Sequence, residues 1–135
     1  MDFLIDTNFL IGRWRSGKTG AEQAFINSHL GAAIGLPWIV KAEFLRGAEL
    51  AAHPAKEVAS FIDRYPVVWP DEETLRIYAH TYAELMHINQ MIGPHDLWIA
   101  ASALRTKLPL LTGNVSEFSR IPDLRVEDYT KADTL

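Results

Sequence analysis

Acidic side chains occur in this sequence at three places where the surrounding pattern predicts buried structure. Asp6 follows the short apolar run Phe3-Leu4-Ile5, Glu43 lies beside the apolar face of a predicted helix, and Asp96 opens another helix on its apolar side. A carboxylate near a core is costly unless a partner neutralises it. Gathered carboxylates repel one another, and their pKa values rise unless a cation lies between them. The three acids therefore predict a cation-binding site.

The ligand types indicate which cation such a site would hold. The chain has no Cys, and its five His are scattered without the close spacing of metal ligands. An all-oxygen site selects Mg²⁺, with Mn²⁺ as a substitute, over Zn²⁺. We therefore expect a magnesium site.

Each acid also has a purely structural interpretation. Asp6 is as well suited to cap a helix that begins at Thr7 as to bind a ligand. Glu43 alone could be a half-exposed helix residue, and Asp96 alone could cap the helix after Gly93 and Pro94. The interpretation as a site gains weight when the acids are taken together, because parallel-sheet topology brings strand ends and helix N-termini to one edge.

The elements that must position these acids alternate along the chain. Short apolar runs predict strands at 3–5, 32–34, 67–69, 110–111 and 124–126, with helices between them. Pro37 is expected in the first turn of the helix that carries Glu43. This order predicts an α/β fold with a short, mainly parallel central sheet, in a single domain over residues 1–135.

A second group of polar residues follows the predicted strand Leu110-Leu111. Thr112 and Asn114 come directly after the strand, and Glu117 lies about one helical turn later. Asn114 is neutral, so it adds no charge to a metal site. Glu117 alone is a surface residue by default, but at this strand end it is a candidate fourth ligand.

Composition excludes several other classes of protein. The 135 residues are 48% hydrophobic and 22% charged, which is typical of a globular protein. No apolar run approaches membrane-spanning length and the N-terminus lacks a signal-peptide pattern, so we expect a cytoplasmic protein without a membrane partner. The net charge of -4 argues against a protein whose whole surface binds polyanions. A local basic rim together with metal ions could still bind nucleic acid.

Four motifs in order resemble those of PIN-domain ribonucleases, and most of all the VapC-type toxins of bacterial toxin–antitoxin pairs. They are Leu4-Ile5-Asp6-Thr7-Asn8, Ala42-Glu43-Phe44-Leu45-Arg46-Gly47, Ile92-Gly93-Pro94-His95-Asp96-Leu97-Trp98-Ile99-Ala100-Ala101 and Leu111-Thr112-Gly113-Asn114-Val115-Ser116-Glu117-Phe118. The resemblance covers nearly the whole chain. It implies a three-layer α/β/α PIN-like domain, metal-dependent endoribonuclease activity, an RNA substrate, homodimers and an inhibitory antitoxin.

The resemblance also implies roles for individual residues. Asp6, Glu43 and Asp96 match the metal-binding acids of the family, and Mg²⁺ held there would activate water for attack on a scissile phosphate. Thr7, Asn8, Thr112 and Asn114 could orient ligands or phosphate around that centre. Arg13, Arg15, Lys18 and Arg46 are candidate contacts to the RNA backbone, although solvated surface charge explains each of them singly as well.

The chain departs from the family pattern at two positions. Many relatives carry Asp where this chain has Asn114, so Glu117 is the candidate to take over the fourth acidic position. Relatives often show Asn where this chain has His95, which we interpret as an exposed helix-start residue.

Two other functions remain as alternatives. An aspartyl-phosphate phosphatase or receiver-like protein would use Asp6 as nucleophile, but it needs a second acid where Asn8 stands. A non-catalytic PIN-like module that binds RNA or protein is the other alternative, although such modules usually lose acids and this chain keeps at least three.

Overall fold

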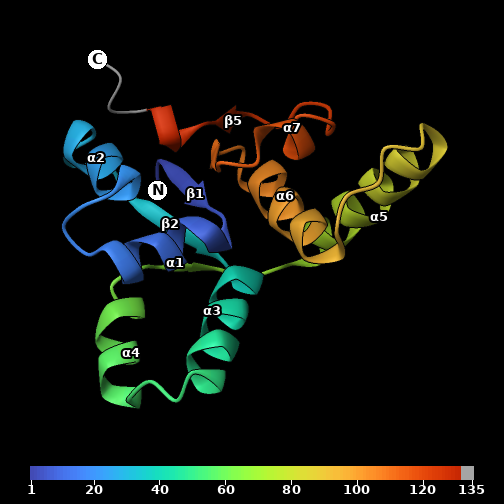
Figure 1. Cartoon of the computed structure of the whole chain (residues 1–135). Coiled ribbons are helices and arrows are strands. Elements are labelled where there is room, and N and C mark those ends of the chain that lie inside the picture. The colour runs from blue at the N-terminus through green and yellow to red at the C-terminus, as the bar shows by residue number, and fades with distance from the viewer. Residues whose placement is uncertain (132–135) are drawn as a thin grey trace.

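The strand β1 (Phe3–Ile5) lies at the centre of a five-stranded sheet in the computed structural model (Figure 1). The structure describes residues 1–131, so the last four residues of the expected domain lie outside the described part. The other strands are β2 (Ile34–Pro37), β3 (Val67–Val68), β4 (Leu110–Leu111) and β5 (Val126–Glu127). The strand order is β3-β2-β1-β4-β5, and every neighbouring pair is parallel.

Helices flank this sheet, with β1 between α1 and α2 on one side and α6 on the other in the view of Figure 1. The helices are α1 (Thr7–Ser16), α2 (Ala21–Ser28), α3 (Trp38–Leu50), α4 (Ala55–Ile62), α5 (Glu72–His87), α6 (Pro94–Thr106) and α7 (Val115–Phe118), followed by the short 3-10 helix Tyr129–Lys131. The predicted α/β class with a parallel sheet is confirmed. Among the described helices, none is both long and apolar enough to cross a membrane.

Strand β2 differs from the sequence prediction in its position along the chain. It spans Ile34–Pro37 rather than 32–34, because its parallel register pairs Ile34 with Phe3 and Gly35 with Leu4. A Cβ atom at Gly35 would lie 2.1 Å from the sulfur of Met1, so a larger residue there would require the exposed and flexible Met1 side chain to move aside. Pro37 ends the strand and precedes α3 instead of starting the helix.

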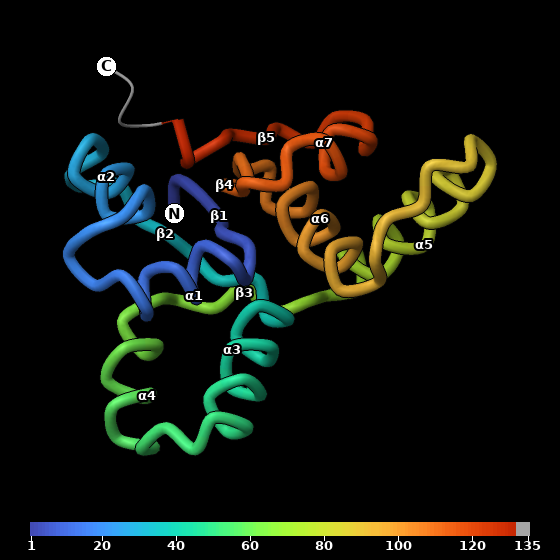
Figure 2. Tube along the Cα trace, viewed as in Figure 1, coloured from blue at the N-terminus to red at the C-terminus, as the bar shows by residue number. Residues whose placement is uncertain are grey.

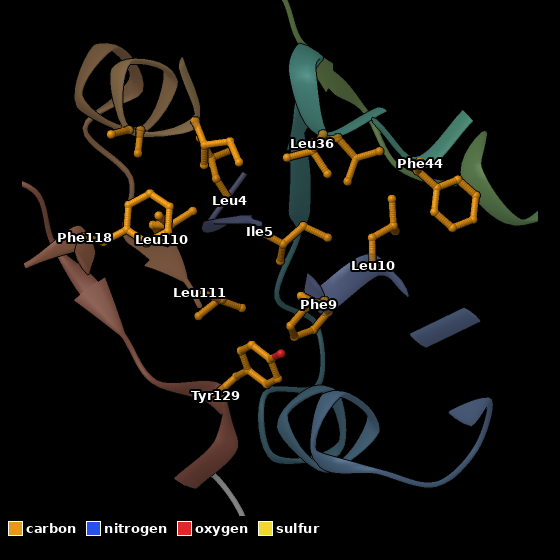
Figure 3. Close-up of a cluster of buried hydrophobic side chains, with 14 of the residues drawn as sticks. Leu4, Ile5, Phe9, Leu10, Leu36, Phe44, Leu110, Leu111, Phe118 and Tyr129 are labelled. Carbon is orange, nitrogen blue, oxygen red and sulfur yellow. The ribbon is translucent and has the colours of Figure 1, made fainter. Parts of the chain in front are cut away.

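The core forms around β1, whose side chains alternate between the two faces of the sheet. Figure 3 shows Ile5 on the side of Phe9 and Leu10 from α1, and Leu4 on the side of Leu110. All five of these side chains are fully buried, at 0% exposure. The backbone at the end of β1 is thus held on both sides, which gives the residue that follows it a defined position.

Helix α5 extends away from the sheet beside α6, as Figure 2 shows. Asp71 caps α5 by accepting a hydrogen bond from the Thr74 amide (3.0 Å), and the Thr74 hydroxyl accepts one from the Asp71 amide (3.2 Å). The same carboxylate accepts from Nε and Nη2 of Arg105 in α6, at 3.1 and 2.8 Å. One exposed carboxylate therefore both starts α5 and ties it to α6.

Substitutions at this contact should separate the cap from the ion pair. We expect Asp71→Ala to lower Tm by a few degrees, because the first turn of α5 loses its acceptor. Arg105→Ala should cost less, because exposed ion pairs contribute little. Asp71→Asn keeps a side-chain oxygen that can accept the capping hydrogen bond, so its loss of Tm should resemble that of Arg105→Ala. Thermal melts of the three variants measure this, and equal losses for Asp71→Ala and Asp71→Asn would show that the cap contributes nothing.

The same contact predicts a stability loss in acid. The Arg105 guanidinium and the Thr74 amide hold the pKa of Asp71 well below its usual range. A lowered folded-state pKa stabilises the protein above the ordinary value of 3.8, and this contribution is lost as the pH falls below it. In thermal melts from neutral pH down to about pH 3, the difference in Tm between the parent and Asp71→Ala should therefore become smaller.

Candidate active site at the carboxyl edge of the sheet

The site lies where the strand order reverses direction. From β1 the chain builds β2 and β3 on one side, then returns to add β4 and β5 on the other. The crevice outside the carboxyl ends of strands at such a switch point is the usual ligand site of open α/β sheets. Asp6 directly follows β1 and Thr112 directly follows β4, so both side chains emerge at this crevice.

Asp6 is buried, with 5% of its surface exposed. Its Oδ1 accepts a hydrogen bond from the Phe9 amide (2.9 Å), which caps α1, and its Oδ2 accepts one from the Thr112 hydroxyl (2.6 Å). Burial raises the pKa of Asp6, and the two hydrogen bonds oppose that shift. Asp6 is therefore both a helix cap and a desolvated carboxylate in the crevice.

Glu43 reaches the same edge from α3. Its Oε1 accepts a hydrogen bond from the Thr7 hydroxyl (2.7 Å), and its Oε2 lies 2.9 Å from Nδ1 of His95. Arg46, one turn further along α3, has its Nη2 3.9 Å from the same oxygen. Glu43 thus joins α1, α3 and the start of α6.

Asp96 shows most clearly that the acids are neighbours. Its pKa is raised from 3.8 to about 6, first by burial and then by the negative charges of Glu117, Glu43 and Asp6. The neighbouring His95 lowers that pKa in part. We call Asp6, Glu43, Asp96 and Glu117 the acid cluster, because their charges interact across four separate elements.

Glu117 enters the acid cluster from α7, the short helix after β4. Its Oε2 accepts a hydrogen bond from the Asn114 side-chain amide (2.7 Å), and its Oε1 accepts one from the Gly93 amide (3.3 Å). The Asn114 backbone amide in turn donates to the Thr112 hydroxyl (2.9 Å). Asn114 therefore orients Glu117, and the two residues act together at this position.

The remaining residues singled out from the sequence fall into two groups. Arg15 lines a hollow that also contains Glu43, so it lies near the acid cluster together with Arg46. Arg13 and Lys18 lie at the far end of α1, where Arg13 donates a hydrogen bond to the Gly17 carbonyl (2.6 Å). Asn8 is exposed in the first turn of α1, and its side chain makes no hydrogen bond to the acids within residues 1–131.

The donor set suits a hard divalent cation, but the side chains are not yet arranged around one. Within residues 1–131, no three Asp, Glu, His or Cys side chains lie close enough together to hold a metal ion as they stand. Protein donors occupy the carboxylates instead, namely Thr112 on Asp6, Thr7 on Glu43 and Asn114 on Glu117. Burial, and then the negative charge of the neighbouring acids, raise the pKa of Asp96.

Two contributors to the site have weak signals in the sequence. His95 is exposed at the start of α6, as expected, but its ring also contacts Glu43. Its position next to Asp96 was the signal available. Tyr129 is buried against Phe9 with ring centroids 4.8 Å apart, and burial together with the charge of Asp6 raises its pKa. No motif marks Tyr129, because only the return of the chain after β5 brings it to α1.

Curated relatives match this chain over almost its full length. Ribonuclease VapC1 of Haemophilus influenzae is 28% identical over 134 residues, covering 97% of this chain and 100% of the relative. The tRNA(fMet)-specific endonuclease VapC of Salmonella typhimurium is 29% identical over 133 residues, covering 96% of this chain and 98% of the relative.

Solved structures also match this chain over almost its full length. A chain of VapBC-1 from nontypeable Haemophilus influenzae superposes with a TM-score of 0.82 at 28% identity, covering 97% of this chain and 100% of that one. A chain of DNA-bound VapBC from Salmonella typhimurium gives a TM-score of 0.84 at 30% identity, with 96% and 98% covered.

The family itself follows from a match over most of the sequence. The PIN domain family profile matches residues 3–124, a range that contains Asp6, Glu43, Asp96 and Glu117. The sheet order, the crevice at its switch point and the acids gathered there accord with that match. This chain belongs to the PIN domain family.

Proposed function

We propose that this chain is a metal-dependent endoribonuclease that hydrolyses RNA phosphodiester bonds and acts as the toxin of a toxin–antitoxin pair. The observation that carries the proposal is the acid cluster, which brings carboxylates from four elements to the switch point of the sheet. Membership of the PIN family and the ribonuclease names of similar proteins support it. Residues 1–135 are proposed to form one such domain.

The proposed cofactor is Mg²⁺, with Mn²⁺ as a substitute. Asp6, Glu43 and Asp96 would hold it, with Glu117 as the fourth carboxylate, because hard divalent cations prefer oxygen ligands. When bound, the ion would polarise the scissile phosphate and lower the pKa of an attacking water.

The side chains around the acids would prepare the site for substrate. Thr112 and the Phe9 amide hold Asp6, while Thr7 and His95 hold Glu43, so both carboxylates have fixed orientations. Such supporting hydrogen bonds usually matter for metal affinity and rate. Arg15 and Arg46 would contact RNA phosphates near Glu43, and the exposed Asn8 would face the substrate.

The proposed protein partners are a cognate antitoxin and a second copy of this chain. Similar solved proteins are VapBC toxin–antitoxin complexes, which supports the first. An antitoxin Arg would suit the acid cluster, because a guanidinium engages carboxylates bidentately. The exposed apolar residues Leu75, Tyr82 and Met86 on α5 support contact between copies.

The first test of the function removes the acids singly. Asp6→Asn, Glu43→Gln and Asp96→Asn should each reduce Mg²⁺-dependent RNA cleavage on the order of 100-fold or more, because each removes charge from one electrostatic site. The double variant Asp6→Asn/Asp96→Asn should lose little further activity, since the acids act as a unit. Full cleavage by Asp96→Asn, or cleavage undiminished by excess EDTA, would contradict the proposal.

A second prediction concerns stability without metal. A folded-state pKa of about 6 for Asp96 exceeds the ordinary value of 3.8, so its contribution to stability is fully present below 3.8 and is lost as the pH rises through about 6. Asn cannot ionise, so Asp96→Asn avoids this loss of stability. In EDTA at about pH 7.5 it should stabilise the protein by roughly 1 kcal/mol, after allowance for solvent screening of a half-buried carboxylate.

Thermal melts at two pH values test this prediction. The Tm advantage of Asp96→Asn over the parent should be a few degrees near neutral pH and should shrink at about pH 5. Mg²⁺ should raise the Tm of the parent by mass action and that of the variant much less. A variant that melts well below the parent in EDTA would show that Asp96 is a structural cap.

A third prediction concerns the fourth position of the acid cluster. Glu117→Gln should raise the Mg²⁺ concentration needed for half-maximal cleavage, because the cluster loses one charge. Asn114→Ala should lower the rate even at saturating Mg²⁺, because the site loses a side-chain amide that can place substrate or water. Asn114→Asp should retain activity at high Mg²⁺ but melt lower in EDTA, because it sets a second carboxylate beside Glu117.

The measurement is a Mg²⁺ titration of the cleavage rate, with the exposed Glu57→Gln on α4 as the matched control. The control removes the same charge far from the crevice and should follow the parent curve. If Glu117→Gln also follows the parent at every Mg²⁺ concentration, the site functions with Asp6, Glu43 and Asp96 alone.

A further inference from the structure

A basic cleft opens at the C-terminal end of α1, between that helix, α2 and α4. Its volume is about 700 Å³, and its walls carry the cations Arg13, Lys18 and Arg64. None of the described residues that line it is acidic. In a chain with a net charge of -4, three cations gathered without an acid make a local positive potential that attracts anions.

Two of the three cations of the basic cleft are held in place by the surrounding structure. Arg13 donates from Nη1 to the Gly17 carbonyl (2.6 Å), while its Nε is buried and has no hydrogen-bond partner in the described part of the chain. The Arg64 guanidinium lies over the Phe61 ring, 5.3 Å from its centroid.

The acid next to Arg64 in the sequence is directed elsewhere. Asp63, which precedes Arg64, pairs with Lys41 on α3, with Oδ1 3.8 Å from Nζ. The carboxylate that could most readily neutralise Arg64 therefore faces away from the basic cleft. Arg64 is therefore available to pair with an external anion.

The basic cleft adjoins the acid cluster along α1. Trp14 lines both the cleft and the neighbouring hollow, which contains Arg15 and Glu43. Asp6 caps the N-terminus of the same helix, and Arg13 lies seven residues further, about 10 Å along the helix axis. A strand bound at the acid cluster could follow α1 past Arg15 and Trp14 to reach the basic cleft.

We propose that the basic cleft binds a backbone phosphate of the RNA substrate, beyond the phosphodiester that is cleaved. The inference rests on the proposed ribonuclease function, which supplies the polyanion. RNA fits because it carries a charge on every nucleotide, so a strand held at one phosphate presents others along α1. Guanidinium groups suit phosphate because they donate in a fork, and Lys18 adds a point charge.

The binding test compares two pairs of substitutions, each made in the Asp96→Asn background so that the RNA stays intact. Lys18→Gln/Arg64→Gln removes two cations from the basic cleft. The matched control, Lys56→Gln/Arg76→Gln, removes two exposed cations on α4 and α5. The dissociation constant of a fluorescently labelled single-stranded RNA is measured by anisotropy over a range of salt concentrations.

The cleft variant should bind this RNA about tenfold more weakly, and its slope of log affinity against log salt should fall in magnitude by about 1.4, the value for two lost contacts to a single strand. The control should keep the parent slope. A cleft variant whose slope and affinity match those of the control overturns the inference. If the double variant fails to fold, Lys18→Gln alone gives the same test, because Lys18 is exposed in a turn.

A kinetic test with Asp96 intact separates this inference from the proposed function. The ratio of kcat/KM for a long RNA to that for a short RNA confined to the acid cluster should fall in the cleft variant and not in the control. If the parent cleaves no RNA with any divalent metal, the proposed function fails. If the parent cleaves and the ratio is unchanged, only the basic cleft inference fails.

If the cleft variant still binds RNA but no longer binds the antitoxin, the basic cleft binds an acidic protein segment instead. This outcome also overturns the inference.

Discussion

The carboxylate of Asp6 is buried where only a few protein donors replace the water it has lost. One oxygen caps α1 and the other accepts from Thr112, so the charge is held by the ends of two neighbouring strands. This arrangement exists only because β1 and β4 are parallel and adjacent, with Ile5 opposite Leu111. The packing of Leu4 and Ile5 in the core fixes that register, and the rest of the site depends on it.

The acid cluster shows a conflict between folding and function. Burial of Asp96, together with the charges of Glu117, Glu43 and Asp6 at the same edge of the sheet, raises its pKa, which means that its charged form is disfavoured in the fold. The chain offsets part of this cost with hydrogen bonds from Thr7, Thr112 and Asn114. Such a concentration of like charge is typical of sites whose role is to bind a cation.

Helix α1 connects two regions of opposite charge. Its N-terminus is capped by Asp6 in the acid cluster, and its C-terminal end carries Arg13 in the basic cleft. Both charges are placed where the dipole of α1 favours them, because an anion is stabilised at the N-terminus of a helix and a cation at its C-terminal end. A polyanion would be attracted directly to the basic cleft, and to the acid cluster only through a bound cation.

The sequence alone determined the residue types and their local settings: apolar runs that become strands, and acids that follow strands or open helices. These properties are local, so residue type and spacing were enough to single out Asp6, Glu43 and Asp96 as acids next to predicted buried structure. Strand β2 was misplaced, because its register with β1 and the space above Gly35 belong to the assembled sheet. Only the tertiary structure decided that Thr112 holds Asp6, that His95 contacts Glu43, and that Arg13 lies apart from Arg15. The physical reason is that these contacts join segments far apart in the chain, and strand order and packing set them rather than any local pattern.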